Sequence, residues 1–309
     1  MRVRELAVVR MLKVIFVGSL LLFSSIGYSE GLDPAKIQLG SVRVSIFDPT
    51  ENVTLYSKNA HIPGPIASIT KLMTAMVVLD ANQPLDELIT IPTLERKSGK
   101  NAYSRMRVGA QISRGDLIRL ALMASENLAA SSLADNYPGG FEAFIQAMNK
   151  KAEDLGMHRT RFVDASGLSI DNVSTASDLT LMLVAAYAYE EIKEFTTTGN
   201  YTARFKNPRH TLGYGNTNRL VHRQSWKVKV SKTGYLDEAG RCLVMISEIE
   251  GKPVAMVLLD SFGKMTPIGD AGRVKRWITT GNSGGVAGAA RDYERRKSAE
   301  ISSYKSVQN

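Results

Sequence analysis

The stretch that decides the fold reads Pro63-Gly64-Pro65-Ile66-Ala67-Ser68-Ile69-Thr70-Lys71-Leu72-Met73 and stays apolar to Leu79. The prolines and the glycine at its start do not fit a helix interior, whereas residues 66–79 are rich in Leu, Met, Ala and Val. A helix is therefore predicted to begin near Pro65, because proline suits a first turn. Apolar residues surround its whole circumference, which predicts a buried, central helix.

Two polar residues of this helix, Ser68 and Lys71, form a candidate nucleophile and base. Ser68 falls in the predicted first turn, where its backbone N–H has no intrahelical acceptor. Lys71 follows on the same helix face and is the only charged residue of the stretch. Burial lowers the pKa of a lysine towards the range of a general base. A chance Ser-x-x-Lys is the alternative, since Ser261 to Lys264 and Ser302 to Lys305 share the spacing.

The first segment of the chain has the pattern of a secretory signal. Basic residues precede an apolar run from Val14 to Phe23 that is too short to span a bilayer comfortably, and small residues follow at Gly27 and Ser29. We expect residues 1–29 to be a secretory signal that is removed on export; an uncleaved membrane anchor is the alternative. Loss of four basic residues and one acidic residue lowers the formal net charge from +9 to +6.

The remaining composition excludes several classes of function. The 309 residues are 44% hydrophobic and 22% charged, as in a globular protein of one or two domains. Lys and Arg are dispersed, with no basic stripe interleaved with aromatic residues, so we expect no nucleic-acid partner. Cys242 is the single cysteine and lies in an apolar strand pattern, and the four histidines lack metal-ligand spacing. We expect no disulfide, metal or cofactor.

The order of the predicted elements indicates an α+β fold. A hairpin is followed by a mostly helical block and then by an antiparallel meander, predicted over residues 42–56, 83–189 and 226–260 respectively. We expect the hairpin and the meander to share one antiparallel sheet of about five strands. The helices, about residues 84–200, would form an inserted all-helical subdomain, with a cleft at its boundary, inside a catalytic domain spanning residues 30–281.

Local signals mark several helix ends. Ser113 and Asp116 form a predicted capping box, and Ser177 is a predicted helix cap. A final helix is expected after Asp270. Residues 282–309 are rich in glycine, serine and charge, which predicts a loose, flexible tail. With few large apolar residues, that tail is a poor membrane anchor, so we expect no stable anchor after signal cleavage.

Two further short motifs accompany Ser68 and Lys71. Ser125-Glu126-Asn127 lies at a predicted break between helices, and Lys232-Thr233-Gly234 ends a predicted strand, where glycine permits close approach of a substrate. Taken singly, each motif has a structural alternative: Ser125 could be a helix cap, and Lys232 could lie in an edge-strand turn. Ser-x-Asn is also a common pattern, since Ser57-Lys58-Asn59 fits it. In this order the three resemble the Ser-x-x-Lys, Ser-x-Asn and Lys-Thr-Gly set of penicillin-binding proteins and serine β-lactamases.

The resemblance covers nearly all of the chain after the signal, to about Thr280. Residues 67–74, 216–220 and 232–240 are similar to low-molecular-mass D-alanyl-D-alanine peptidases acting on peptidoglycan, and residues 125–130 and 137–140 to their DD-endopeptidase branch. The resemblance implies a serine β-lactamase/penicillin-binding-protein-like fold. It also implies peptidoglycan peptide cross-links as substrate and β-lactams as covalent inhibitors.

The resemblance implies the following catalytic roles. Ser68 would attack the carbonyl of a D-alanine and form an acyl-enzyme, while Lys71 takes its proton. Ser125 would pass a proton to the leaving amine, and Asn127 would hydrogen-bond the peptide side of the substrate. Repulsion from Lys232 would help to keep Lys71 neutral.

The third motif would bind the substrate. By resemblance, Lys232 and Thr233 hold a substrate carboxylate, and Gly234 lets the substrate backbone approach the strand. The backbone N–H groups of Ser68 and Tyr235 would form the oxyanion hole.

Several activities share these motifs. A soluble periplasmic DD-endopeptidase cutting D-alanyl–diaminopimelate cross-links is favoured. Carboxypeptidase relatives usually carry a second β-rich domain and an amphipathic anchor after the catalytic domain, whereas here we expect only the tail of residues 282–309 to follow it. A D-alanyl-D-alanine carboxypeptidase is the nearest alternative. A class A β-lactamase needs a carboxylate that activates water, and residues 161–168 offer only Asp164. A non-catalytic penicillin sensor or cell-wall binding protein is the remaining alternative, against which the intact motifs argue.

Overall fold

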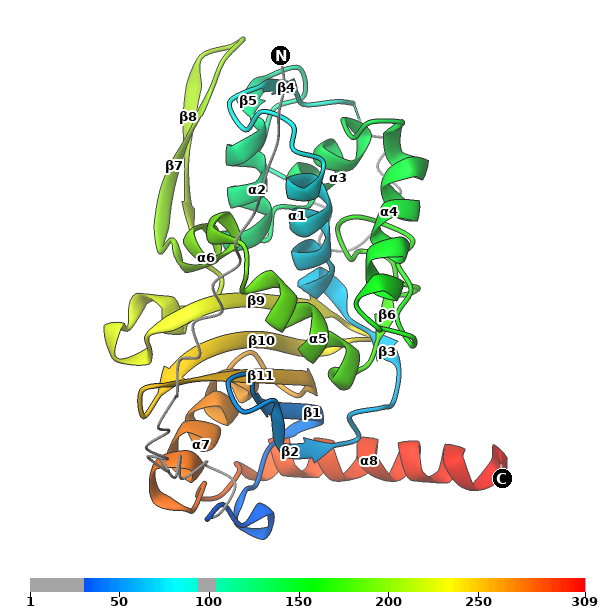
Figure 1. Ribbon diagram of the computed structural model, residues 1–309, viewed down its shortest axis with the longest axis vertical. Coiled ribbons are helices and arrows are strands. Elements are labelled where there is room, and N and C mark those ends of the chain that lie inside the picture. The colour runs from blue at the N-terminus through cyan, green and yellow to red at the C-terminus, as the bar shows by residue number, and fades with distance from the viewer. Residues whose placement is uncertain (1–30, 94–103, 309) are drawn as a thin grey trace, which may run out of the picture.

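The computed structural model describes residues 31–93 and 104–308 of the chain, with side chains to residue 303 (Figure 1). The expected signal peptide, residues 1–29, therefore lies outside the described residues. Within the two described ranges, no helix combines the length and the apolar character needed to cross a membrane.

A five-stranded antiparallel sheet in the order β2-β1-β11-β10-β9 forms the centre of the fold. Its strands are β1 Ser41–Asp48, β2 Val53–Lys58, β9 Val228–Leu236, β10 Gly240–Ile249 and β11 Lys252–Ser261. The N-terminal hairpin joins the C-terminal meander through β1 and β11, where Ser41 lies opposite Ser261. This confirms the prediction of one sheet built from both ends of the chain.

Both faces of the sheet are covered, as the strand pattern requires. Successive residues of β10 alternate between two apolar cores: Val244 and Ile246 join the core of the helical block, and Leu243 and Met245 join the core around Trp277. The helical block and α5 (Ala176–Ala186) lie on one side of the sheet in Figure 1, and α7 (Thr266–Thr280) and α8 (Gly288–Gln308) lie on the other.

The helical block surrounds α1 (Thr70–Asp80), which is buried from Thr70 to Val78 and contacts five other helices. The other helices of the block are α2 Arg114–Met123, α3 Asn127–Asp135, α4 Gly140–Asp154 and α6 Glu190–Thr197. Short 3-10 turns occur at Pro34–Lys36, Ala67–Ile69, Arg219–His222 and Gln224–Trp226. Three two-stranded ribbons complete the fold: β3 Gly64–Pro65 with β6 Val173–Ser174, β4 Leu88–Thr90 with β5 Gln111–Ser113, and β7 Asn200–Phe205 with β8 His210–Gly215.

The predicted helix ends are partly confirmed. Ser113 Oγ accepts a hydrogen bond from the Asp116 N–H at 3.1 Å, so the predicted cap of α2 is confirmed. The prediction for α5 is wrong by two residues, because Thr175 caps this helix in place of Ser177. The first helix begins at Thr70 and not near Pro65, because Gly64–Pro65 pairs with β6 as a strand.

The prediction of a loose tail is wrong for most of residues 282–309. Gly288–Gln308 forms α8, whose first half packs beside β1 and β11. Lys58 Nζ forms an ion pair with Glu294 at 3.0 Å, and the Tyr293 hydroxyl donates a hydrogen bond to Asp260 at 2.7 Å. Polar contacts on one helix face help to hold α8 beside a few apolar ones, and a hydropathy pattern does not reveal such polar contacts.

Asp270 of α7 anchors the start of β1. Its carboxylate is fully buried and accepts hydrogen bonds from Gly40 N at 3.0 Å, Ser41 N at 2.7 Å and Ser41 Oγ at 2.6 Å. Arg273 Nη1 donates a further bond at 3.0 Å. Bonds to a charged acceptor are strong, and their loss would leave buried N–H groups without partners.

Replacing Asp270 with alanine should therefore lower the free energy of unfolding by about 3 kcal/mol, as measured by urea denaturation. Asp171→Ala, at an exposed loop position, is the matched control and should cost less than about 0.5 kcal/mol. Equal stabilities of the two variants would contradict the anchoring role of Asp270.

Candidate active site

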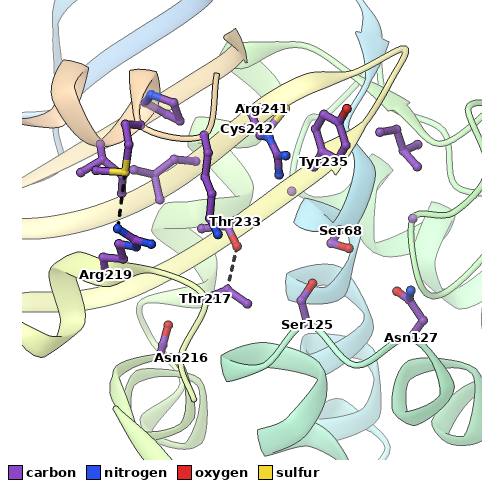
Figure 2. Close-up of a pocket in the computed structure, with 18 of the residues that line it drawn as sticks. Ser68, Ser125, Asn127, Asn216, Thr217, Arg219, Thr233, Tyr235, Arg241 and Cys242 are labelled. Carbon is purple, nitrogen blue, oxygen red and sulfur yellow. Dashed lines mark hydrogen bonds between the residues drawn. The ribbon is translucent and has the colours of Figure 1, made fainter. Parts of the chain in front are cut away.

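A cleft of about 530 Å³ lies where β9 meets the helical block, and all three motifs contribute to its lining. Figure 2 shows Ser68, Ser125 and Asn127 on one side, facing Thr233 and Tyr235 on the other. Residues 167–168, 215–217, 241–243 and 264–265 also contribute to the lining. The expected boundary between the sheet and the helical subdomain is thus where the cleft lies.

Ser68 occupies the 3-10 turn immediately before α1, with two glycines packed against its backbone. A Cβ atom built on Gly167 would lie 2.0 Å from the Ala67 carbonyl oxygen, and one built on Gly234 would lie 3.2 Å from Ser68 N. Ala67 takes φ +48, which is uncommon for a residue other than glycine. A side chain at position 167 would overlap the backbone, and one at position 234 would be tight, so these two neighbours fix the position of Ser68.

The Lys71 amine is buried and surrounded by three oxygens. Its Nζ lies 2.9 Å from Ser68 Oγ, 2.7 Å from Asn127 Oδ1 and 2.5 Å from the Ser166 carbonyl oxygen. The amide and carbonyl oxygens can only accept, so a neutral amine donates both N–H groups to them. Its lone pair is then left for the Ser68 hydroxyl proton.

Burial lowers the pKa of both lysines in the site. For Lys71 it lowers the pKa to about 7, although the negative charges of Asp164 and Glu126 act in the opposite direction. For Lys232 it lowers the pKa well below the ordinary value, and the charge of Lys71 adds to this effect. The expected repulsion between the two lysines thus lowers the pKa of Lys232. The lowered pKa of Lys71 is mainly caused by burial.

The Ser-x-Asn motif connects the two lysines to the break between α2 and α3. Lys232 Nζ donates to Ser125 Oγ at 2.8 Å and to the Thr233 carbonyl oxygen at 2.8 Å. Ser125 takes φ +59, and Asn127 is the first residue of α3. Ser125 therefore contacts Lys232, while Asn127 contacts Lys71.

A loop at residues 164–169 supplies the Ser166 carbonyl oxygen, a contact that was not predicted. The Asp164 carboxylate organises this loop by accepting hydrogen bonds from the backbone N–H groups of Ser166 at 2.7 Å, Gly167 at 2.5 Å and Ser169 at 2.6 Å. An aspartate shortly before glycine is a turn signal that could have indicated it. Because backbone amides occupy both oxygens of Asp164, it is not arranged as the base that a class A β-lactamase needs.

Three cations, Arg219, Arg241 and Lys264, also line the cleft and are called the cationic rim below. Arg241 Cζ lies 3.5 Å from the centre of the Tyr235 ring, which is opposite it in the sheet. None of the described residues that line the cleft is acidic, so the cationic rim favours an anionic ligand. The contact of Arg241 with Tyr235 depends on the register of β9 against β10, which sequence spacing alone does not give.

Lys264 belongs to one of the Ser-x-x-Lys matches set aside above. Ser261 Oγ lies within hydrogen-bond distance of Ser41 Oγ, at 2.8 Å, inside the sheet. Lys264 lines the cleft, whereas Ser261 is buried between strands. This pair is therefore not a second nucleophile and base.

Cys242 is buried in β10, and burial raises the pKa of its thiol to about 11. Its interpretation as a packed strand residue is confirmed. Among the residues that the structure describes, no group of three or more His, Cys, Asp or Glu side chains could hold a metal ion.

The variants Gly167→Ala and Gly109→Ala should differ in their free energy of unfolding because, of these two glycines, only Gly167 touches the backbone beside Ser68. Both glycines have positive φ, +79 and +80, but a Cβ atom on Gly109 would meet nothing within 4 Å. We expect urea denaturation to show a loss of about 1 kcal/mol for Gly109→Ala and about 3 kcal/mol for Gly167→Ala. Equal losses would show that the Ala67 contact relaxes without cost.

This chain is similar to known D-alanyl-D-alanine peptidases over most of its length. Residues 33–263 match the family described as D-alanyl-D-alanine carboxypeptidase. The D-alanyl-D-alanine endopeptidase of Pseudomonas aeruginosa is 48% identical over 267 residues, covering 86% of this chain and 86% of the relative. The D-alanyl-D-alanine endopeptidase of Escherichia coli (strain K12) is 49% identical over 264 residues, covering 85% of each chain.

Two solved structures confirm the predicted α+β fold. The Streptomyces K15 DD-transpeptidase is 29% identical with a TM-score of 0.73, covering 79% of this chain and 98% of its own. Penicillin-binding protein D2 from Listeria monocytogenes, in a cefotaxime-bound form, is 30% identical with a TM-score of 0.68, covering 78% and 98%. The chain belongs to the D-alanyl-D-alanine carboxypeptidase family.

Proposed function

We propose that this protein is a serine DD-endopeptidase that hydrolyses D-alanyl–diaminopimelate cross-links in peptidoglycan through an acyl-enzyme. The observation that carries the proposal is the contact at 2.9 Å between Ser68 Oγ and the buried Lys71 amine, whose pKa is about 7. Both relatives near 50% identity are named D-alanyl-D-alanine endopeptidases. Export to the periplasm belongs to the same proposal and is supported by the signal-like pattern of residues 1–29.

Acylation begins when Ser68 Oγ attacks the D-alanine carbonyl and its proton moves to the neutral Lys71 amine. Negative charge develops on the carbonyl oxygen, and the backbone N–H groups of Ser68 and Tyr235 are the proposed donors to it. Each such donor typically contributes about 3 kcal/mol to transition-state stabilisation. The close packing of Gly167 and Gly234 against residues 67 and 68 supports this role, because it fixes the Ser68 N–H before the substrate arrives.

The leaving amine then needs a proton. Ser125 is the proposed donor, since its Oγ accepts a hydrogen bond from Lys232 and can give up its own proton while taking one from that amine. Breakage of the C–N bond releases the diaminopimelate side of the cross-link. The Lys71 ammonium next gives up the Ser68 proton, which replaces the one lost by Lys232, and so becomes neutral again. Water then attacks the acyl carbonyl and gives a proton to Lys71, which passes it to the Ser68 oxygen as the acyl bond breaks.

Substrate binding is assigned to the remaining motif residues. Lys232 and Thr233 bind the carboxylate next to the scissile bond, and Thr233 Oγ1 is held by its hydrogen bond to Thr217 Oγ1 at 2.7 Å (Figure 2). An arriving carboxylate raises the pKa of the Lys232 amine and favours its charged form. Asn127 binds the peptide side of the acyl donor, and a β-lactam would enter through the same contacts.

The choice of endopeptidase over carboxypeptidase is supported by the cationic rim. A carboxypeptidase releases one D-alanine with one carboxylate, whereas an endopeptidase also accommodates the second peptide and its additional carboxylates. Three rim cations without an acidic lining residue among the described ones suit the larger anionic leaving group. A D-alanyl-D-alanine carboxypeptidase, the activity in the family description, remains the second candidate.

Digestion of purified cross-linked muropeptides followed by chromatography tests the proposal. We expect dimers to be converted to monomers without release of free D-alanine, and Ser68→Ala should lower the rate by more than about ten-thousand-fold. Release of D-alanine from pentapeptide monomers, with dimers left intact, would identify a carboxypeptidase instead. No acylation of Ser68 by labelled penicillin would contradict the enzyme class.

The rate of acylation by labelled penicillin should rise with pH through about 7 and then level off. Below pH 7 the Lys71 amine is protonated and cannot take the Ser68 proton, and above it the amine is neutral. Lys71→Arg stays protonated, so it should lower the rate by about 10²–10⁴-fold and remove this rise. Lys252→Arg on the surface is the control, and a wild-type rate that is flat between about pH 5 and 9 would rule out Lys71 as the base.

A further inference from the structure

We propose that Tyr293 of α8 is a positioning residue for the cationic rim and acts through Asp260 at the end of β11. The inference rests on the proposed endopeptidase function, because that function assigns the rim to substrate binding. No described residue of α8 lines the cleft, so any effect of Tyr293 on the substrate must pass through other residues.

Tyr293 makes two contacts with the end of β11. Its hydroxyl donates a hydrogen bond to Asp260 Oδ1 at 2.7 Å, and its ring lies 5.7 Å from the Phe262 ring, centre to centre. Burial and the bond to Asp260 raise the pKa of Tyr293, so the hydroxyl remains a donor at neutral pH. The two contacts hold the residues on either side of Ser261.

Asp260 has a backbone conformation that depends on its neighbours. Its φ is +54, in the left-handed region that residues other than glycine seldom occupy. A Cβ atom built on Gly240 would lie 2.8 Å from Asp260 Oδ1 and 3.0 Å from its Cα. Asp260 is therefore enclosed between the Tyr293 hydroxyl and the Gly240 backbone.

Asp260 is connected to all three cations of the rim through neighbouring residues. Gly240 is followed by Arg241, which pairs with Ser261 across the strands and lies over the Tyr235 ring. In the other direction, the chain from Phe262 carries Lys264 and Met265 into the cleft. Arg219 Nη1 lies 3.9 Å from Met265 Sδ, the contact drawn with a dashed line in Figure 2. Release of Asp260 would thus shift the rim without a direct contact to Ser68 or Lys71.

The helix that carries Tyr293 is fixed independently. Glu294 pairs with Lys58 at 3.0 Å, and Asn59 Nδ2 donates to Ser298 Oγ at 3.2 Å, so α8 is attached to the end of β2. Neither contact touches Asp260. The Ser298 hydroxyl also donates to Glu294 Oε1 at 2.9 Å. Ser298→Ala therefore removes hydroxyl hydrogen bonds from the same helix without touching Asp260 and is a matched control for Tyr293→Phe.

The test is steady-state hydrolysis of cross-linked muropeptide dimers by the intact protein and its variants. Tyr293→Phe should raise KM about five-fold and leave kcat within about two-fold, because the rim binds the leaving peptide and Ser68 and Lys71 are untouched. Asp260→Asn keeps an acceptor for the hydroxyl and tolerates positive φ, so its KM should stay within about two-fold of wild type. Ser298→Ala should behave as wild type. An unchanged KM for Tyr293→Phe, or an equal rise for Ser298→Ala, overturns the inference.

Amide hydrogen exchange gives a second readout that needs no activity. Exchange across residues 260–266 should be about five-fold faster in Tyr293→Phe than in wild type and unchanged in Ser298→Ala. Equal exchange in all three proteins also overturns the inference. If the wild-type protein leaves dimers uncut, the proposed function fails on that result alone, and the exchange rates still decide the role of Tyr293.

Discussion

The fold keeps the Lys71 amine out of water, and the chemistry of the cleft depends on this constraint. A buried ammonium is costly unless a counter-charge contacts it, so burial alone drives Lys71 towards its neutral form. The hydrogen-bond partners of its amine are a hydroxyl, an amide oxygen and a peptide carbonyl oxygen. A carboxylate in their place would keep the lysine protonated. Asp164 and Glu126 act on its pKa only through their charge, and the Asp164 carboxylate is already bound by loop amides.

This arrangement requires the two layers of the molecule to be assembled together. The amine lies on α1, the amide oxygen comes from the start of α3, and the carbonyl oxygen comes from the loop at residues 164–169. The second lysine lies on β9 and reaches Ser125 at the break before α3. Ser68 itself is held between Gly167 of that loop and Gly234 of the sheet. The packing that forms the core therefore also sets the protonation state of the catalytic groups.

The sequence predicted the periodic features well, and it missed features that depend on contacts between distant segments. Alternation along the strands and the wholly apolar circumference of α1 were sufficient to place the sheet and the central helix. The start of α1 was misplaced because Gly64–Pro65 pairs with Val173–Ser174, a pairing that local propensity for a proline-initiated helix does not include. Likewise, α8 lacks a strong apolar stripe, and contacts such as Lys58 with Glu294 join residues 236 positions apart.

The motif residues were found because they are short local patterns, whereas their partners were not. The carbonyl of Ser166 carries no side-chain signal, and the stacking of Arg241 on Tyr235 follows from strand register. The cationic rim likewise gathers residues from three separate segments of the chain. Backbone acceptors and cross-strand neighbours of this kind can be identified only from the tertiary structure.

The pairing of β1 with β11 also sets the stage of synthesis at which the central sheet can be completed. Ser41 and Ser261 meet through their hydroxyl groups across 220 positions of sequence. Closure of so long a loop costs entropy before the contacts between β1 and β11 form, which slows folding. During synthesis β1 has no β11 to pair with until almost the whole catalytic domain has been made. The central sheet therefore cannot be completed on a growing chain until β11, the strand between β1 and β10, has left the ribosome.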